Sequence, residues 1–365
     1  MNGSPAVKDR QLPETFVLEL TRRCNNRCVY CYLPGGVSAP NSEAARAAEM
    51  TLAEVCDLVA ALREQLPLRT IALSGGEPLL REDLPQILSF LRELGVQPVV
   101  ITNGTLLAPE KINALGPDVT FEIPLLSYRW SVHDQLVKRP GAWESVVANL
   151  THLRRARGSF VAVFVATRIN STDLRKTAEL AIALGADALM YNRINLGRHN
   201  IRRAAELVPT PGMIEENLDT LEDIGEKYKL AISASVVIEP CVVDVTKYKH
   251  VHFGWCPLGG QGSYFAIDPL GNLRVCNHSP VVLGNLRLQT FASLYYEHPY
   301  LRRFRETWPA ECRGCVPERR SLCCGGCKAA AEQCYGSMDR VDPFVTINLG
   351  LHTQPAATDN SRSSG

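Results

Sequence analysis

Apolar residues recur along the first two-thirds of the chain in two alternating patterns. Short apolar runs typical of β-strands cover residues 15–20, 69–73, 98–102, 119–123, 160–167 and 188–193. Between them, apolar positions follow helical spacing near residues 51–65, 83–94, 142–157, 171–184 and 212–229. This alternation predicts an α/β fold in which crossover helices connect the strands of a parallel sheet, open or closed into a barrel.

The stretch 83–94 illustrates how such a helix is recognised. Its apolar residues recur at positions i, i+3, i+4 and i+7, as on one face of a helix: Leu84, Ile87, Leu88 and Leu91. We expect Asp83 to cap the first turn by accepting a backbone N–H, and Gly95 to follow the last turn.

The pattern changes near residue 240. Strand–helix alternation stops there, and eight of the 13 cysteines lie between Cys256 and Cys334. We therefore expect an α/β core domain over residues 15–238 and a smaller cysteine-rich domain over 239–345. Residues 1–14 and 346–365 contain few large apolar side chains, so both ends are expected to be flexible.

Composition and charge narrow the function classes. The chain is 45% hydrophobic and 21% charged, as in ordinary soluble proteins, and its net charge of +1 argues against nucleic acid or a membrane surface as the main partner. Neither a membrane-spanning run nor a secretory signal is recognisable. We therefore expect a cytoplasmic protein. In that reducing compartment the cysteines are more readily explained as metal ligands than as disulfides.

Three of these cysteines follow the first predicted strand. Cys24, Cys28 and Cys31 have the spacing C-x₃-C-x₂-C. Three thiolates on one loop can bind three irons of a [4Fe–4S] cluster, which leaves the fourth iron open to a cofactor or substrate. A zinc site would need a fourth ligand, and no further Cys or His lies nearby in the sequence.

With Tyr30 as the aromatic residue before the last cysteine, this motif resembles the signature of the radical S-adenosylmethionine (SAM) superfamily. The second predicted strand ends in Gly75-Gly76-Glu77-Pro78, which is similar to the segment that contacts the SAM amino group in that family. The resemblance covers residues 15–235. It implies a partial (β/α)₆ barrel whose [4Fe–4S] cluster cleaves SAM to a 5′-deoxyadenosyl radical, which then abstracts a substrate hydrogen.

The same resemblance suggests a set of residues that contact SAM. Glycines allow close backbone approach, and Glu77 could pair with the cofactor's ammonium group. Further candidates lie where predicted strands end, although each could equally bond its own loop. The expected contacts are Tyr30, Gly75, Gly76, Glu77, Pro78, Asn103, Ser127, Asn170 and Arg193, with Glu122 and Asn192 as weaker correspondences. His133 and Asp134 fit either a catalytic or a loop-capping role, and no residue is identifiable as a catalytic base.

The C-terminal cysteines resemble the SPASM extension of radical SAM maturases. Cys256 and Cys276 flank a predicted hairpin with its turn at residues 268–272. The resemblance implies one or two auxiliary iron–sulfur clusters. The first would be bound by Cys256, Cys276 and Cys327, and the second by Cys312, Cys315, Cys323 and Cys334.

Three points in this region stay open. Cys334 follows Cys327 by only seven residues, closer than is usual in the family. The fourth ligand of the first cluster is undetermined, with Cys324 and Cys241 as further candidates. A structural zinc site formed by Cys312, Cys315, Cys324 and Cys327 is the alternative. Cys56 is expected to be a small apolar residue within a helix.

The overall pattern resembles peptide-modifying maturases, in particular the subgroup that includes the pyrroloquinoline quinone maturase. It implies crosslinking or oxidation of a peptide, with an electron donor such as flavodoxin or ferredoxin. Because only 14 residues precede the first predicted strand, a separate leader-peptide-binding protein is expected. The alternative is an enzyme that acts on a small metabolite, such as a sugar, a tetrapyrrole or a nucleotide-derived cofactor precursor. A third hypothesis, in which the protein is not an enzyme, is a non-catalytic iron–sulfur or zinc scaffold.

Overall fold

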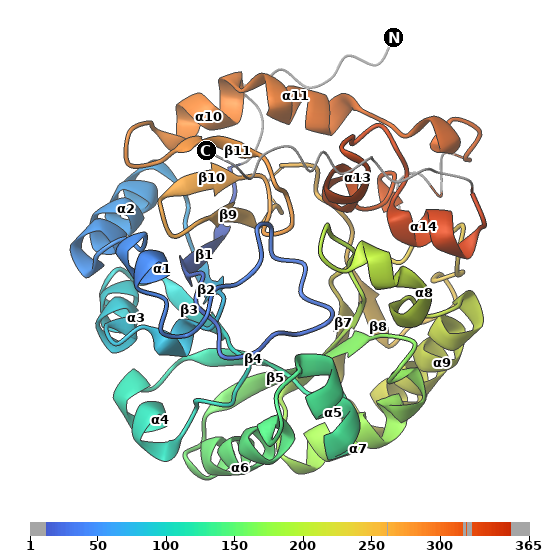
Figure 1. Ribbon diagram of the computed structural model, residues 1–365, viewed down its shortest axis with the longest axis horizontal. Helices are drawn as coiled ribbons and strands as arrows, with labels where there is room; N and C mark the ends of the chain where they lie inside the picture. The colour runs from blue at the N-terminus through green and yellow to red at the C-terminus, as the bar shows by residue number, and fades with distance from the viewer. Residues whose placement is uncertain (1–11, 261, 317–318, 320–322, 352–365) are drawn as a thin grey trace.

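The computed structural model describes residues 12–351 except 261, 317–318 and 320–322. Most of both predicted flexible ends lies outside these residues. An 11-stranded sheet organises the fold, in the order β11-β10-β9-β1-β2-β3-β4-β5-β6-β7-β8. Figure 1 shows this sheet curved into a ring, with helices around its outside.

All six predicted strands are present, and they pair in parallel. They are β1 (Thr15–Thr21), β2 (Thr70–Gly75), β3 (Gln97–Ile101), β4 (Thr120–Pro124), β5 (Ser159–Ala166) and β6 (Ala188–Arg193). Two short parallel strands that the apolar pattern did not reveal follow them, β7 (Ala231–Ala234) and β8 (Val251–Phe253). The predicted α/β barrel architecture is confirmed.

The helices lie between successive strands. They include α1 (Glu43–Ala47), α2 (Leu52–Gln65), α3 (Leu84–Glu93), α4 (Pro109–Leu115), α5 (Trp130–Val137), α6 (Ala142–Arg155), α7 (Leu174–Ala183), α8 (Ala204–Leu207) and α9 (Pro211–Tyr228). Helix α3 buries the four predicted apolar residues. Asp83 stands at its N-cap position but makes no capping bond, because its carboxylate pairs with Arg81 at 2.6 Å. The expected cap is therefore wrong.

The strands separate two apolar environments. Side chains on their outer face pack against the helices in the main core, whereas Val17, Ala72 and Ala266 form a small cluster of their own with Val99 and Ile101 against it. Successive side chains of a strand point to opposite faces, so this second cluster lies on the inner face of the ring.

The cysteine-rich segment is not a separate layer. Strand β9 (Phe265–Ile267) pairs in parallel with β1, and β10 (Asn272–Arg274) and β11 (Val282–Asn285) continue the sheet from there. Among the described residues, the helices that follow are α10 (Phe291–Glu297), α11 (Pro299–Glu306), α13 (Lys328–Tyr335) and α14 (Pro343–Asn348). Helix α14 thus extends beyond residue 346, where the flexible tail was expected to begin. In Figure 1, α13 and α14 occupy the arc between α11 and α8.

Candidate active site

The loop that follows β1 carries the three N-terminal cysteines across the middle of the ring, in dark blue in Figure 1. Backbone bonds from Arg27 N–H to the Val137 carbonyl (3.1 Å) and from Val29 N–H to the Leu136 carbonyl (2.8 Å) fasten it to the end of α5. The loop is therefore held in place at the carboxyl ends of the strands, where α/β barrels carry their active sites.

The three thiols of this loop lie near one another. Cys24 interacts electrostatically with Cys31, and Cys28 with both. Burial, reinforced by these neighbours, raises the pKa of Cys24 to about 11 and that of Cys28 further still. Since iron binds the thiolate, metal binding at this loop must release protons.

Asn26, between the first two cysteines, points to a bound group. Its side chain is 2% exposed, yet neither the amide nitrogen nor the amide oxygen has a hydrogen-bond partner. A buried unpaired amide is costly, so such groups are rare in folded proteins. Beside it, Asn25 accepts a bond from Asn103 Nδ2 (2.7 Å) and donates one to Thr105 (2.8 Å), which joins the loop to the end of β3. The donor set and the unpaired amide fit a cluster with its cofactor.

The two glycines at the end of β2 are required by backbone packing. A Cβ at Gly75 would lie 2.3 Å from the Thr21 carbonyl oxygen, and one at Gly76 would lie 2.2 Å from that of Arg23. The close approach allows Gly76 N–H to donate to Thr21 (2.7 Å) and Glu77 N–H to donate to Arg23 (2.8 Å). These glycines hold the predicted SAM-binding turn against the cysteine loop.

Glu77 makes several hydrogen bonds within the protein. Its side chain is fully buried, and its carboxylate accepts bonds from Leu79 N–H (3.0 Å), the Thr102 hydroxyl (2.6 Å) and Asn103 N–H (2.8 Å). It caps the 3₁₀ turn that begins at Pro78 and ties β2 to β3. These bonds give Glu77 a structural role, and its pairing with the cofactor's ammonium group stays a prediction.

Three further expected SAM contacts are buried and bonded within the protein. Ser127 donates to Asp173 (2.5 Å). Asn170 accepts from Thr167 and donates to the carbonyls of Leu126 and Val165. Arg193, fully buried, pairs with Glu239 (3.0 Å) and Asp342 (2.7 Å). These positions organise loops and join the barrel to the C-terminal segment, and their contact with SAM stays a prediction.

Two other expected SAM contacts, Tyr30 in the cysteine loop and Asn103 at the end of β3, are half-buried. The Tyr30 hydroxyl bonds to the Cys28 thiol. Asn192 accepts three bonds, from the hydroxyl and backbone of Ser235 and from Val236 N–H. Asp134 accepts from Gly141 and Trp143 N–H groups, so it caps the loop before α6.

Glu122 is an acidic residue on the inner face of the barrel; Glu19, which also faces inward, is paired with Arg274. Phe121 and Ile123, the neighbours of Glu122, lie in the outer core, so the Glu122 side chain points to the inner face. Burial alone raises the pKa of its carboxyl. A half-buried carboxyl of this kind can exchange a proton with a substrate inside the ring.

The C-terminal cysteines form two groups. Cys256 interacts electrostatically with Cys276 and Cys324, and Cys327 interacts with Cys256 and Cys276.

Among the residues that the structure describes, no three Cys, His, Asp or Glu side chains gather closely enough to hold a single metal ion. Thiolates around one zinc ion lie within about 4 Å of one another because each Zn–S bond is ~2.3 Å long, whereas the ligands of a [4Fe–4S] cluster bind different irons.

Tyr32 joins the N-terminal cysteine loop to the first of these groups. Its hydroxyl accepts a bond from Asn277 Nδ2 (2.8 Å), and its ring centroid lies 4.9 Å from that of His278. Gln333 donates both to the Tyr32 carbonyl (3.2 Å) and to the His278 carbonyl (2.7 Å). The residue after Cys31 therefore touches the residues after Cys276. Sequence reasoning missed this bridge, since its only signal was a polar or aromatic residue directly after each cysteine.

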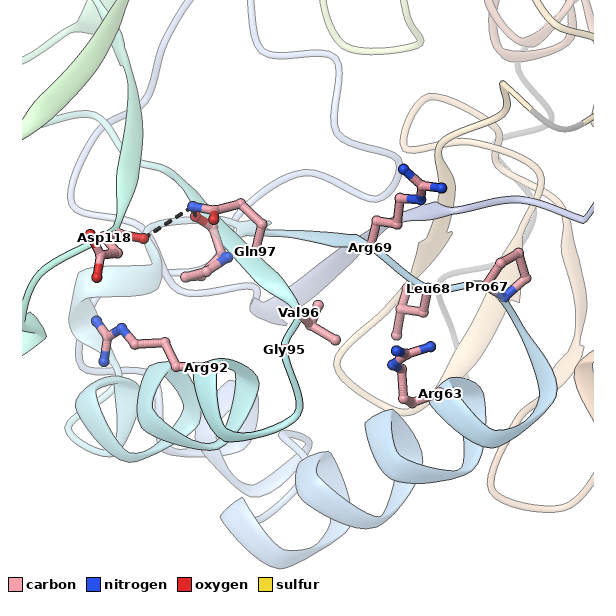
Figure 2. Close-up of a pocket in the computed structure, with 10 residues that line it drawn as sticks. Arg63, Pro67, Leu68, Arg69, Arg92, Gly95, Val96, Gln97 and Asp118 are labelled. Atoms are coloured by element: carbon pink, nitrogen blue, oxygen red, sulfur yellow. Dashed lines mark hydrogen bonds between the residues drawn. The ribbon is translucent and has the colours of Figure 1, made fainter.

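The pocket in Figure 2 lies at the other end of the barrel. It is bordered by Arg63, Arg69, Arg92 and the residues that precede β3. Arg69 pairs with Glu14 (3.0 Å), and Arg92 donates to the Leu115 carbonyl (2.5 Å). Because these residues precede the strands rather than follow them, the pocket is not part of the cysteine site.

Comparison with known proteins identifies the barrel. Residues 18–181 match the family model of the radical SAM superfamily. This chain contains a radical SAM domain. Its family uses a [4Fe–4S] cluster and SAM, and the cysteine-rich C-terminal segment fits auxiliary clusters. No helix in the described residues is long and apolar enough to cross a membrane.

The proteins similar to this chain include a heme synthase and two solved structures with bound peptides. An AdoMet-dependent heme synthase from Methanosarcina barkeri (strain Fusaro / DSM 804) is 28% identical over 358 residues, which cover 93% of this chain and 97% of that enzyme. Streptococcus suis SuiB, solved with its precursor peptide SuiA, has a TM-score of 0.69 at 13% identity over 92% of this chain and 76% of its own. The enzyme anSMEcpe, solved with AdoMet and the Cp18Cys peptide, has a TM-score of 0.66 at 16% identity over 93% and 95%. The two structural likenesses establish the fold.

Proposed function

We propose that this radical SAM enzyme oxidises a peptide side chain, with the first C-terminal cysteine group as the exit for an electron. The observation that carries the proposal is the Tyr32–Asn277 hydrogen bond of 2.8 Å, which links the cysteine loop of the SAM site to the segment of Cys276. An enzyme that only abstracts and returns a hydrogen has no need for such a link.

When bound, the cluster and SAM would supply a 5′-deoxyadenosyl radical after one-electron reduction. Within the chain, Cys24, Cys28 and Cys31 would hold the cluster, and Asn26 would bond the group beside it. Removal of one hydrogen atom leaves a substrate radical. A closed-shell oxidised product then requires the loss of one electron and one proton. Glu122, with its raised pKa, is an interior group suited to take that proton.

An iron–sulfur cluster held by Cys256, Cys276 and Cys327 would receive the electron, by a route that passes Tyr32. The half-buried Tyr32 packs on His278 and bonds Asn277, so it offers a continuous bonded route through the protein. An electron donor such as flavodoxin or ferredoxin would supply the electron that starts SAM cleavage. A separate leader-peptide-binding protein would present the peptide, and we place the enzyme in the cytoplasm.

The choice of a peptide is supported by the two fold neighbours, whose structures contain peptide substrates. A tetrapyrrole is the second candidate. It is favoured by the heme synthase, whose 28% identity extends over nearly the whole of both chains, including the C-terminal segment. Both reactions would be oxidations, so the route through Tyr32 serves either substrate.

An anaerobic assay distinguishes these substrates. The enzyme, reconstituted with iron and sulfide, is incubated with SAM and dithionite, and then with synthetic peptides encoded next to its gene or with an iron porphyrin that carries propionate groups. We expect 5′-deoxyadenosine above the substrate-free level, and a peptide that loses two hydrogen atoms by mass spectrometry. Stimulation by the porphyrin alone would replace the peptide by the second candidate. The Cys24/Cys28/Cys31→Ala variant is the control, and absence of 5′-deoxyadenosine from the wild type would refute both.

A further inference from the structure

Of the 13 cysteines, ten lie outside the N-terminal loop, and one of these stands apart. Cys56 is on α2, and its electrostatic neighbours are the acidic residues Asp57, Asp83 and Glu93. Nearby carboxylates disfavour the thiolate form of Cys56, which is the form that binds iron, so this residue is unsuited to be a ligand. The remaining nine are one more than two complete sets of four ligands would need.

Cys334 is the cysteine that does not fit either group. It lies on α13, is 6% exposed and belongs to the main hydrophobic core. Seven helical residues also place it about 10 Å along the axis from Cys327, at the start of α13. A buried apolar role accounts for all of these features.

Cys241 comes from a distant part of the chain, between β7 and β8. Its thiol interacts electrostatically with those of Cys323 and Cys312, and Cys323 in turn interacts with Cys315. Cys312 and Cys315 are held close by a turn in which Cys315 N–H donates to the Cys312 carbonyl (3.1 Å). These four thiols therefore converge on one region.

The backbone around Cys241 is fastened in that position. Val242 and Val243 N–H groups donate to the Glu239 carbonyl (2.8 and 3.1 Å), which forms a turn with Cys241 inside it. The Glu239 carboxylate is only 2.8 Å from the place that a Cβ on Gly326 would occupy. Gly326 N–H donates to the Cys323 carbonyl (2.9 Å). The turn that carries Cys241 is thus packed directly on the Cys323–Cys327 segment.

A buried ion-pair network fixes the same junction from the other side. Arg193 pairs with Glu239 (3.0 Å) and with Asp342 (2.7 Å), and Asp342 accepts a bond from Cys327 N–H (2.9 Å). The position of the Cys241 turn relative to the C-terminal loop is therefore set by contacts that do not require iron.

We propose that Cys241, together with Cys312, Cys315 and Cys323, completes the second auxiliary cluster, and that Cys334 is not a ligand. Cys324 then completes the first set with Cys256, Cys276 and Cys327. The proposal rests on the auxiliary clusters of the proposed function. It changes their architecture, because a ligand from the connection between β7 and β8 would join that part of the barrel to the C-terminal cysteine loop through iron.

The test compares Cys241→Ala with Cys334→Ala after anaerobic reconstitution. Iron and sulfide per chain are measured together with low-temperature EPR spectra, in the absence of substrate. With two auxiliary clusters, the wild type contains about 12 irons. We expect Cys241→Ala to lose up to about four irons, or to convert one cluster to a three-iron species with its own EPR signal. Cys334→Ala should match the wild type. The opposite result, with iron lost only from Cys334→Ala, would overturn the proposal.

A labelling measurement on the wild type guards against a variant that fails to fold. Cys241 is exposed, so iodoacetamide should reach it in the protein from which iron has been chelated. We expect reconstitution to protect Cys241, as detected by peptide mass spectrometry. Equal labelling with and without iron would contradict the assignment. Neither measurement depends on turnover, so failure of the substrate proposal would appear separately, as loss of stimulated 5′-deoxyadenosine formation alone.

Discussion

Replacement of Glu77 by glutamine distinguishes a structural carboxylate from a SAM ligand. One carboxylate oxygen accepts from Leu79 N–H and the Thr102 hydroxyl, and the other accepts from Asn103 N–H. In Glu77→Gln, the amide NH₂ must face at least one of these donors. At least one hydrogen bond is therefore lost, and the NH₂ group and that donor point at each other. Hydrogen bonds to charged groups contribute about 1.5–3 kcal/mol each, so we expect a loss of at least this size in the free energy of unfolding.

The assay measures stability and cofactor binding on the same protein. For a chain of this length, a loss of about 1.5–3 kcal/mol lowers Tm by roughly 2–4 °C in calorimetry. Well below Tm, the Kd for SAM should change by less than about threefold, or ~0.6 kcal/mol. Glu82→Gln is the matched control, since its side chain is 88% exposed. An unchanged Tm with SAM binding weakened more than about tenfold would refute the reasoning and support the pairing with ammonium.

Three other expected outcomes follow from the same structure. Gly76→Ala places a Cβ 2.2 Å from the Arg23 carbonyl oxygen, so it should displace the cysteine loop and reduce the iron bound there, as measured in reconstituted protein; a full iron content would contradict this. Tyr32→Phe leaves Asn277 without its acceptor and should slow electron exchange between clusters in freeze-quench EPR, with SAM cleavage retained; an unchanged rate would exclude the route. Burial lowers the pKa of His133 to about 4, below its unfolded value of 6.5, so the native state resists its protonation. Stability from this group is complete above pH 6.5 and should fall by up to about 3 kcal/mol as the pH drops to about 4; urea titrations of His133→Gln should lack this part of the slope.

The fold was predictable to the extent that its signals are local. Apolar periodicity is imposed by whichever face of a strand or helix is buried, and it located the six strands that form most of the barrel. The spacing of Cys24, Cys28 and Cys31 is also local, because one short loop must present all three thiols. Strands β7 and β8 have four and three residues, too few for a pattern to be recognised. The pairing of β9 with β1 joins residues about 250 positions apart, which no local pattern encodes.

The direction of polar side chains was decided by tertiary structure. The sequence by itself determined that polar groups follow the strands, at Glu77, Asn170 and Arg193, but it did not determine what they contact. Folding places Thr102 and Asn103 beside Glu77, and Asp342 beside Arg193, because a buried charge or amide must find partners wherever the chain provides them. We propose the same origin for the grouping of the C-terminal cysteines: the family resemblance implied Cys334 as a ligand, whereas the turn at Glu239 packs on the Cys323–Cys327 segment and carries Cys241. Ligand type is a property of the sequence, and ligand proximity is a property of the fold.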